Sequence, residues 1–298
     1  MTVVPVDELR PLSFAVAYRM LGSVAEAEDV VQEALLRLHD TPEVDNPEAW
    51  LTTTTTRLAI DVLRSARVRR ERYVGEWLPE PLVEEVGTTQ VEDEETISLA
   101  FLVLLERLTP EERAVLVLRD AFDYSFAEIA QIVGKSEANT RQILSRARRH
   151  VDAERPRFDP DPQQRFELAT RFLQAAREGD MDELVAMLAP DAVLTGDGGG
   201  KAVAAARSLV GAEAVARALR AFAVRGDRYW QVRFEPVLVN GQPGLLVLDG
   251  DGRLVSVQAL DIVDGRVARV YGVVNPDKLG HLGTELSPVA LRPQSRLR

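Results

Sequence analysis

The sequence contains no cysteine and only three histidines among 298 residues. The absence of cysteine excludes disulfides, thiolate zinc sites, iron–sulfur clusters and cysteine nucleophiles. The histidines are far apart in the sequence, at His39, His150 and His281, and suggest no metal cluster. No apolar run approaches the ~20 residues of a membrane-spanning helix, and the first residues lack the basic flank and apolar stretch of a signal peptide. We therefore expect a cytoplasmic protein.

Basic charge is scarce overall but is concentrated in two segments. The net charge is −11. Residues 57–72 nevertheless hold six arginines against two acids, and residues 141–149 hold four arginines and no acid, so each segment carries +4. An acidic chain does not bind polyanions nonspecifically, but each arginine-rich segment can neutralise several phosphates.

Residues 6–75 have the pattern of a helical bundle, with apolar residues recurring every three to four positions. Ser23 and Glu26 form a capping box that predicts a second helix. Pro47 suits the first turn of a third helix that reaches about Arg72.

Residues 76–95 are predicted to form a flexible acidic linker, because they hold eight acids and no base. An apolar cluster, Trp77-Leu78-Pro79, is embedded in this segment. Two interpretations stay open for it: a surface tryptophan resting on the nearest helix, or a specific docking segment.

Residues 96–155 are expected to be helical and to contain a helix-turn-helix. Thr109 and Ser125 each begin a capping box. A turn at Gly134 precedes an arginine-rich helix that Ser136 can cap. A structural three-helix bundle with a solvated arginine face would give the same pattern, so the pattern alone leaves both open.

After three prolines between residues 156 and 162, the pattern changes to α+β. Three helices are expected between residues 163 and 222. The strands that follow are expected at about 230–235, 245–248, 254–263 and 266–274. Asp264-Gly265 predicts a two-residue hairpin turn. Helices followed by an antiparallel meander that wraps around them predict a small α+β cone.

Short motifs in the first half resemble those of bacterial sigma factors of the extracytoplasmic-function (ECF) group. Residues 27–35 resemble the polymerase-binding helix of that group, and residues 49–61 resemble its promoter-melting helix. Residues 108–113 and 128–148 resemble the domain that reads the −35 element. The motifs occur in the expected order over about 150 residues.

The second half is similar to the polyketide-cyclase-like (SnoaL-like) domain, which has the NTF2-like cone fold. Sigma factors with this extension form a subgroup, and three strings fit it: WLPEP at 77–81, DGGGK at 197–201 and NPDKL at 275–279. The resemblance implies a multidomain fold: two all-α sigma domains, namely a region 2 helical bundle and a region 4 helix-turn-helix, followed by the α+β cone. The expected domains are region 2 at 1–75, the acidic linker at 76–95, region 4 at 96–155, a Pro-rich linker at 156–162, the SnoaL-like domain at 163–285 and a tail at 286–298.

The resemblance implies an RNA polymerase sigma factor, not an enzyme, that binds core polymerase, recognises −35 and −10 elements and directs transcription initiation. Such a protein is expected to need no cofactor of its own. The implied partners are promoter DNA and the β′ clamp helices and β flap of the core polymerase, with an unknown small ligand possible in the cone and no membrane. Polymerase docking is expected from one helix face: Asp29, Gln32, Glu33, Leu36 and Arg37. From the pattern alone, a solvated face is the favoured interpretation of Asp29 and Glu33, and it is the resemblance that favours docking.

Contacts to the −10 element are expected from the helix that carries the first arginine stripe: Asp61, Arg57, Arg64, Arg67, Arg69 and Arg70. Arginines hold a strand through phosphates, whereas an aspartate near DNA needs a base amino group to accept from. The equal alternative for Asp61 is a salt bridge to Arg57 or Arg64 within the helix.

Contacts to the −35 element are expected from the recognition helix: Ser136, Glu137, Asn139, Arg141, Gln142, Arg146, Arg148 and Arg149. Its first turns can reach base edges in the major groove, whereas the last three arginines are expected to meet phosphates. Thr140 and Leu144 are expected to face the domain core.

We expect the C-terminal domain to regulate the sigma regions in cis by binding the linker. The expected contact residues are Trp77, Leu78 and Pro79 in the linker and Asp197, Lys201, Asn275, Pro276, Asp277, Lys278 and Leu279 in the cone. Tethering gives millimolar effective concentrations, so a weak contact would be well populated. Lys201 and Lys278 are expected to face the linker acids. The alternative is that residues 275–279 merely end the last strand.

Two other functions stay open: a SnoaL-like cyclase or isomerase with a DNA-binding arm, and a DNA-binding repressor that senses a ligand in the cone. An enzyme would need an acid and a base, for which Asp197, Asp261 and Tyr271 are the candidates, but nothing in the sequence pairs them. The three glycines after Asp197 predict a flexible loop. The motif at 27–37 distinguishes a sigma factor from both alternatives, because neither alternative needs to bind polymerase.

Overall fold

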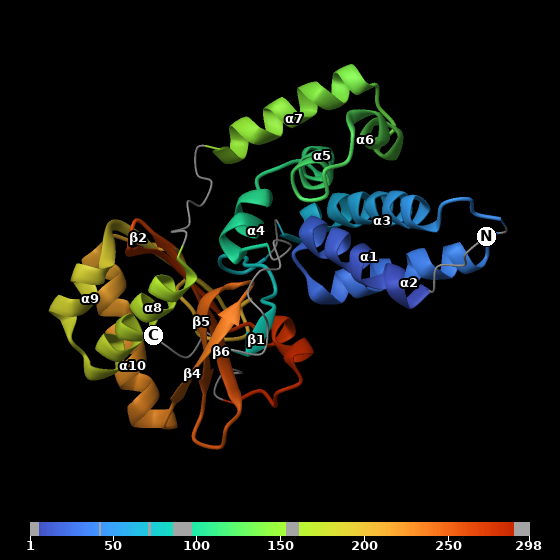
Figure 1. The fold of residues 1–298 in the computed structure, drawn as a ribbon. Coiled ribbons are helices and arrows are strands. Elements are labelled where there is room, and N and C mark those ends of the chain that lie inside the picture. The colour runs from blue at the N-terminus through green and yellow to red at the C-terminus, as the bar shows by residue number, and fades with distance from the viewer. Residues whose placement is uncertain (1–5, 42, 71–72, 86–96, 153–160, 289–298) are drawn as a thin grey trace. The chain divides into compact units, whose positions relative to one another are not determined.

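The structure is a computed structural model that describes residues 6–41, 43–70, 73–85, 97–152 and 161–288. The chain divides into two compact units, Met1–Arg72 with Leu102–Arg155, and Tyr73–Phe101 with Pro156–Arg298. The described part of the first unit is helical, and the second unit combines helices with a β-sheet (Figure 1). No helix in the described part of the chain has the length and apolar character needed to cross a membrane.

The described residues up to Asp152 contain seven helices: α1 (Val6–Leu21), α2 (Val24–His39), α3 (Pro47–Arg70), α4 (Leu99–Leu105), α5 (Pro110–Asp120), α6 (Phe126–Val133) and α7 (Glu137–Asp152). The first three run alongside one another (Figure 1). Three threonines of α3, Thr52, Thr55 and Thr56, are buried. Tertiary packing therefore outweighs the low helix propensity of threonine.

The helix ends in this unit follow from local chemistry. Ser23 accepts a hydrogen bond from the amide of Glu26 at 3.2 Å and caps α2. Thr109 and Glu112 bond each other's backbone amides at the start of α5, a complete capping box. Gly134 ends α6 at φ +65°, a left-handed conformation that glycine adopts without steric cost. These helix ends confirm the expectations from the sequence.

The second unit contains strands and helices in the order β1 (Val83–Glu85), α8 (Pro162–Glu178), α9 (Met181–Met187), β2 (Leu188–Asp197), β3 (Leu209–Val210), α10 (Ala212–Trp230), β4 (Arg233–Val239), β5 (Gln242–Leu248), β6 (Leu254–Val263) and β7 (Arg266–Val273). Two short 3-10 helices, η1 (Pro276–Lys278) and η2 (Gly280–Leu282), follow β7. The sheet order is β1-β4-β5-β6-β7-β2-β3. All pairs are antiparallel except β2 with β7.

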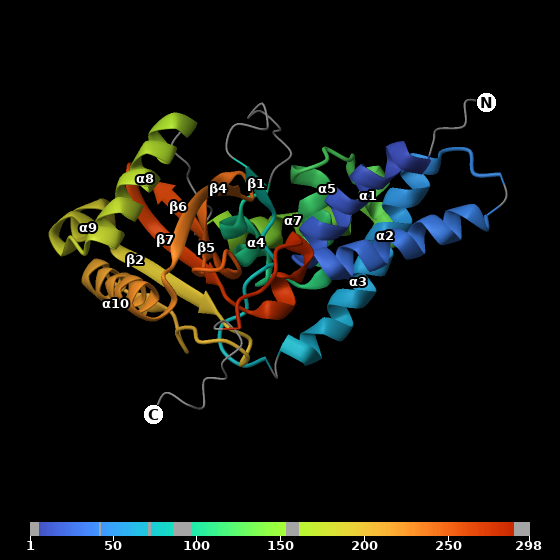
Figure 2. The ribbon, with the colours of Figure 1, turned by 90° about the horizontal axis from the view of Figure 1, so that it is seen from below.

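Helices α8, α9 and α10 cover one face of this sheet (Figure 2). Phe172, Leu184, Val215, Leu260 and Val270 belong to the buried core between the helices and the strands. The expected α+β cone is therefore confirmed, but the sheet is mixed, not purely antiparallel.

Two local expectations for this unit need correction. Helix α10 continues to Trp230, so the strand expected from 230 begins at Arg233. Strand β2 was not predicted, because proline and glycine interrupt its apolar pattern and its partner β7 lies far along the chain. The turn at Asp264 and Gly265 has φ +50° and +68°, as the predicted hairpin requires.

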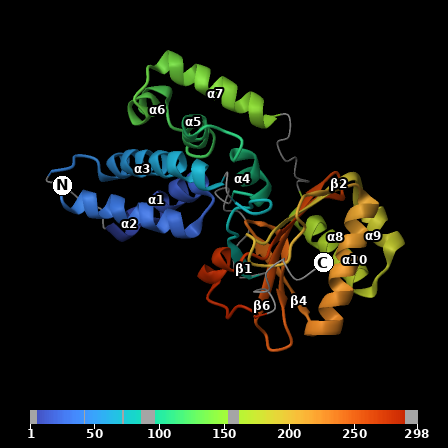
Figure 3. The same cartoon turned by 180° about the vertical axis from the view of Figure 1, so that it is seen from behind.

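The segment predicted as a flexible linker, 76–95, is ordered over residues 76–85. Its β1 pairs antiparallel with β4, Val83 opposite Val239, at one edge of the sheet (Figure 3). The expectation of flexibility is wrong there because backbone pairing satisfies the polar groups of β1. The other residues of the predicted linker, up to 95, lie outside the described ranges. The domain boundaries themselves stay predictions.

Candidate functional site

The predicted polymerase-docking face lies on α2, whose opposite side packs in the helical bundle. Its five residues are exposed: Asp29, Gln32, Glu33, Leu36 and Arg37. Leu36 is 54% exposed, although its side chain is large and apolar. Glu33 accepts a hydrogen bond from Arg37 Nε at 2.8 Å. The face therefore presents one apolar side chain among charged groups, an arrangement suited to a protein partner.

The first two arginines predicted for the −10 element bind other helices of the same unit. Arg57 donates from Nε to the carbonyl of Ile132 and from Nη2 to that of Gln131, both at 3.0 Å. These carbonyls lie in the last turn of α6, where helices leave acceptors unsatisfied.

Arg64 forms two ion pairs. Its guanidinium lies 3.1 Å from Asp61 on α3 and 2.6 Å from Glu111 on α5. The hydrogen bond from Arg64 lowers the pKa of the Glu111 carboxyl. The alternative considered for Asp61, a salt bridge within its helix, is thus present in this structure. The side chains of Arg67, Arg69 and Arg70 lie outside the described residues.

The recognition helix α7 presents two different faces. Thr140 and Leu144 are buried, as expected, and Ala147 and Val151 continue the same face. The residues predicted to reach the −35 element are all exposed: Ser136, Glu137, Asn139, Arg141, Gln142, Arg146, Arg148 and Arg149.

The exposed arginines of α7 differ in their contacts. Arg141 lies over the ring of Phe126, 4.0 Å from its centroid. Arg148 is paired with Asp120 of α5 at 2.7 Å. Arg146 has no hydrogen bond or ion pair with any described residue, so its guanidinium is available to a phosphate.

A second cluster of polar groups is buried where the linker segment meets the cone. Asp197, at the end of β2, is fully buried. Its Oδ1 accepts from the hydroxyl of Tyr73 at 2.5 Å and from the amide of Gly199 at 3.0 Å. Its Oδ2 accepts from the amide of Leu78 at 2.8 Å and from Lys278 Nζ at 2.6 Å. Four donors compensate the cost of burying this carboxylate.

Lys278 completes the cluster from η1. Its buried ammonium donates to the carbonyl oxygen of Leu78 and to Asp197. The same nitrogen lies 4.0 Å from the ring centroid of Trp77 and 5.0 Å from that of Tyr73, within the range of cation–π attraction. We call this group of five residues the linker clamp: Tyr73, Trp77, Leu78, Asp197 and Lys278.

The glycines after Asp197 form a tight turn, not the flexible loop that we expected. Gly199 and Gly200 have φ +56° and +72°. A Cβ on Gly199 would lie 2.3 Å from the side-chain nitrogen of Asn275, and one on Gly200 would lie 3.1 Å from Cβ of Val74. The close approach of the linker and of Asn275 requires glycine at these positions.

The last predicted string, 275–279, does more than end a strand. The side-chain amide of Asn275 donates to the hydroxyl of Tyr73 at 2.8 Å, and Leu279 is fully buried. Pro276 begins η1 and so directs Lys278 toward the cluster.

Two aspartates of the cone are partners of the predicted lysines. That the lysines also face the linker acids stays a prediction, because the acids at 92–95 lie outside the described residues. Lys201 pairs with Asp277 at 2.5 Å, and Lys278 pairs with Asp197 at 2.6 Å.

Two residues that bind the linker segment to the cone were not predicted from the sequence. Tyr73 was not singled out, although it is an aromatic residue four positions before Trp77. Buried Asn240 donates to the carbonyl of Ile97 and accepts from the amide of Leu82, both at 3.1 Å. The Asn-Gly pair at 240–241 is a hairpin signal that could have located the turn after β4.

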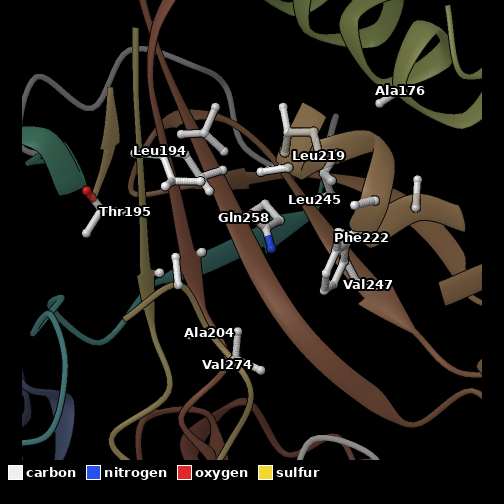
Figure 4. Close-up of a pocket in the computed structure, with 18 of the residues that line it drawn as sticks. Ala176, Leu194, Thr195, Ala204, Leu219, Phe222, Leu245, Val247, Gln258 and Val274 are labelled. Carbon is white, nitrogen blue, oxygen red and sulfur yellow. The ribbon is translucent and has the colours of Figure 1, made fainter. Parts of the chain in front are cut away.

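A cavity of about 360 Å³ lies inside the cone between α8, α10 and the sheet (Figure 4). None of the three enzyme candidates, Asp197, Asp261 and Tyr271, lines it. Its described lining contains no carboxylate and no imidazole that could act as a general acid or base. The described residues also contain no group of three or more acidic or histidine side chains placed to hold a metal ion.

Family models match three parts of the chain. Sigma-70 region 2 matches residues 6–69, Sigma-70, region 4 matches residues 98–151, and the SnoaL-like domain matches residues 169–274. The ECF RNA polymerase sigma factor SigJ of Mycobacterium tuberculosis is 40% identical over 315 residues, which cover 100% of this chain and 99% of that protein. The chain belongs to the ECF RNA polymerase sigma factors.

Further comparisons agree. The probable ECF sigma factor SigI of M. tuberculosis is 32% identical over 91% of this chain and 92% of its own length. The crystal structure of M. tuberculosis SigJ matches with a TM-score of 0.77 and 38% identity, over 94% of this chain and 98% of that one. The fold class and sigma-factor function predicted from the motifs are thus confirmed. Membership of this family implies binding to core RNA polymerase and promoter DNA in a regulatory role.

Proposed function

We propose that this ECF sigma factor docks on the β′ clamp helices through the exposed face of α2 and on the β flap through region 4. In this proposal α3 contacts the −10 element and α7 contacts the −35 element. Exposed Leu36 among charged neighbours supports the first contact. The guanidinium of Arg146, which has no partner among the described residues, supports the last. Arg57 and Arg64 would exchange their present protein partners for DNA phosphates.

We also propose that the C-terminal domain controls initiation in cis through the linker clamp. The observation that carries this proposal is the burial of Asp197 among donors from both the linker and the cone. Residues 73–78 directly follow region 2 in the chain. They cannot leave the cone without breaking these hydrogen bonds, because Tyr73 and Leu78 donate to Asp197. Docking of residues 73–78 on the cone shortens the free chain between the two sigma regions. Release of these residues should increase the distance that the two regions can span.

The test is run-off transcription with purified core polymerase on a template that carries the promoter of this chain's own gene. We expect a transcript only when both the core and the full chain are present. A template-specific transcript without the chain, or none with it, would contradict the sigma-factor role on that promoter.

The regulatory part is tested in the same assay with Trp77→Ala. Loss of the ring over Lys278 should weaken the clamp and raise initiation severalfold, while the thermal midpoint of unfolding changes little. Val74→Ala is the matched control, because Val74 lies in the same segment and its side chain is 56% exposed. Equal transcription by wild type, Trp77→Ala and Val74→Ala would reject control through the clamp.

A further inference from the structure

The cavity of the cone is large for a domain whose role is only structural. Protein interiors are close-packed, and few of their voids exceed a water molecule. At about 360 Å³, this cavity falls within the size range of small-molecule sites, roughly 300–1,000 Å³. Leu219, Phe222, Leu245 and Val247 are among the side chains that form its largely apolar wall (Figure 4).

One polar side chain projects among these apolar groups. Gln258, on β6, directs its amide toward the middle of the cavity (Figure 4). One N–H of this amide donates to Ser256 Oγ at 3.2 Å, so Oε1 and the second N–H are the groups that a ligand would meet. A Cβ on Gly272 of the neighbouring strand would lie 2.9 Å from Gln258 Oε1, so glycine there leaves room for the amide. Thr195 also lines the cavity, but its hydroxyl is hydrogen-bonded to Ser208 at 2.9 Å.

The lining determines which ligands can bind. A buried charge would need a counter-charge, and the charged side chain in the described lining, Arg225, is exposed. A ligand with a mainly hydrocarbon body and one hydrogen-bonding group would bury its apolar surface and pair with Gln258. An uncharged molecule therefore fits the cavity best.

The cavity and the linker clamp share the ends of two strands. Thr195 and Gly196 line the cavity and directly precede Asp197 on β2. Val274 lines it directly before Asn275, and the amides of both bond the backbone carbonyl of Asp197, at 2.8 and 2.9 Å. A ligand that packs against these residues would therefore stabilise the strand ends in the arrangement in which Asp197 accepts hydrogen bonds from the linker.

We propose that the cone binds an uncharged, mainly hydrocarbon ligand with one carbonyl, hydroxyl or N–H group, and that its binding stabilises the linker clamp. Gln258 recognises the polar group of the ligand. The two effects are reciprocal, because coupling between two sites acts equally in both directions. An effect of the ligand on transcription rests on the proposed function. Ligand binding and its coupling to the linker clamp can be measured without transcription.

Binding is tested on the full chain with N-phenyl-1-naphthylamine, an uncharged fluorescent probe with two ring systems and one N–H. We expect a saturable fluorescence increase at one site per chain. Ala218→Trp on α10 fills the cavity and should weaken binding more than tenfold. Arg217→Trp, which adds the same side chain outside the cavity lining, should bind as wild type does.

Gln258→Leu keeps the size of the side chain and removes the amide, so it tests the site even if Ala218→Trp does not fold. The probe should bind about fivefold more weakly, as expected for one neutral hydrogen bond. Pyrene, which has no hydrogen-bonding group, should not lose affinity. No saturable binding to wild type, equal probe binding by wild type and folded Ala218→Trp, or no selective loss in Gln258→Leu would overturn the proposed site.

Coupling is tested by hydrogen exchange of the peptide that contains the amide of Leu78, which donates to Asp197. Saturating probe should slow exchange of this peptide severalfold in wild type and in Arg217→Trp, and not in Ala218→Trp. Unchanged exchange at saturation would overturn the coupling. A negative transcription result would leave these measurements intact, so failure of the two proposals can be told apart.

Discussion

Asp197 and Asp261 are both buried aspartates of the cone, but their surroundings differ. Asp197 accepts from four donors. Asp261 has an Oδ1 without a hydrogen-bond partner among the described residues, and its Oδ2 lies 3.9 Å from Arg269 Nε. Burial raises the pKa of Asp261 to about 6, only partly offset by Arg269. One carboxylate is thus held by its neighbours, whereas the other opposes folding when it is ionised.

The raised pKa of Asp261 predicts a pH dependence of stability. Between about pH 4 and 6 the folded state binds this proton and the unfolded state releases it, so the free energy of unfolding falls as the pH rises. Asp261→Asn should remove this slope and, above pH 7, be more stable than wild type by roughly 2 kcal/mol. Urea unfolding from pH 4.5 to 8 measures this difference.

Asp264→Asn is the control for that measurement, because Asp264 is exposed in the turn of the same hairpin, where asparagine is well tolerated. Its stability curve should stay parallel to that of wild type. Parallel curves for Asp261→Asn as well would contradict the pKa shift.

The lysines of the cone provide a second comparison between single residues. Lys278→Met leaves Asp197 without its buried counter-charge and should lower the free energy of unfolding by about 3–5 kcal/mol. Lys201→Met removes the same charge from a half-exposed pair and should cost about 1 kcal/mol at most. Thermal unfolding of both variants tests this, and equal losses would show that burial of the clamp is not decisive.

The same reasoning predicts the result of truncating the C-terminal end of the cone. Cutting after Val274 would remove Lys278 and the buried side chain of Leu279. Such a chain would lose stability as well as regulation, so a point variant such as Trp77→Ala separates the two effects better.

At the scale of elements, the residues of α7 that we propose to face DNA differ in their position along the helix and in their contacts. Arg146→Ala should weaken promoter binding about equally for all sequences and lower the salt slope by about one. Asn139→Ala should instead change the preference at one −35 position by about 1–3 kcal/mol, as for a bidentate base contact. Fluorescence anisotropy over salt and promoter sequence measures both effects, and identical behaviour of the two variants would contradict this division.

Arg141 and Arg148 are less suited to that comparison. Arg141 stacks on Phe126, and Arg148 is paired with Asp120. Their replacement would alter packing on α5 and α6 as well as contact with DNA. Among the arginines predicted on α7, Arg146 is therefore the best suited to test a phosphate contact, because it has no hydrogen bond or ion pair with a described residue.

At the scale of the whole molecule, the first unit holds regions 2 and 4 together through polar contacts. Fully buried Arg113 of α5 donates to the carbonyl of Met20 at the end of α1 and pairs with Glu106 at 2.6 Å. Burial lowers its pKa to about 9, so it stays charged near neutral pH. Arg57 and Arg64 add contacts from α3 to α6 and α5. Residues predicted to bind DNA therefore also stabilise this packing.

Because Arg64 is predicted to bind DNA and also pairs with Glu111, we expect Glu111→Gln to strengthen DNA binding. Arg64 would lose its ion pair with Glu111 and gain freedom to meet a phosphate, so affinity for a single-stranded −10 oligonucleotide should rise about two- to fourfold at low salt. Asp123→Asn, which changes net charge equally but pairs with Arg119, should have a smaller effect. An equal increase in both variants would mean that net charge alone is responsible.

The sequence by itself determined the helix ends at Ser23, Thr109 and Gly134 and the hairpin turn at 264–265, because caps and turns depend on neighbours within a few residues. It also carried the motifs of both sigma regions, and it named most of the residues that meet around Asp197. Only the tertiary structure decided how these residues pair. The contacts of Leu78 with Asp197 and Lys278 join positions 119 and 200 residues apart, and those of Arg57 reach 75 residues along the chain. No local pattern specifies such partners, because they depend on how whole elements pack.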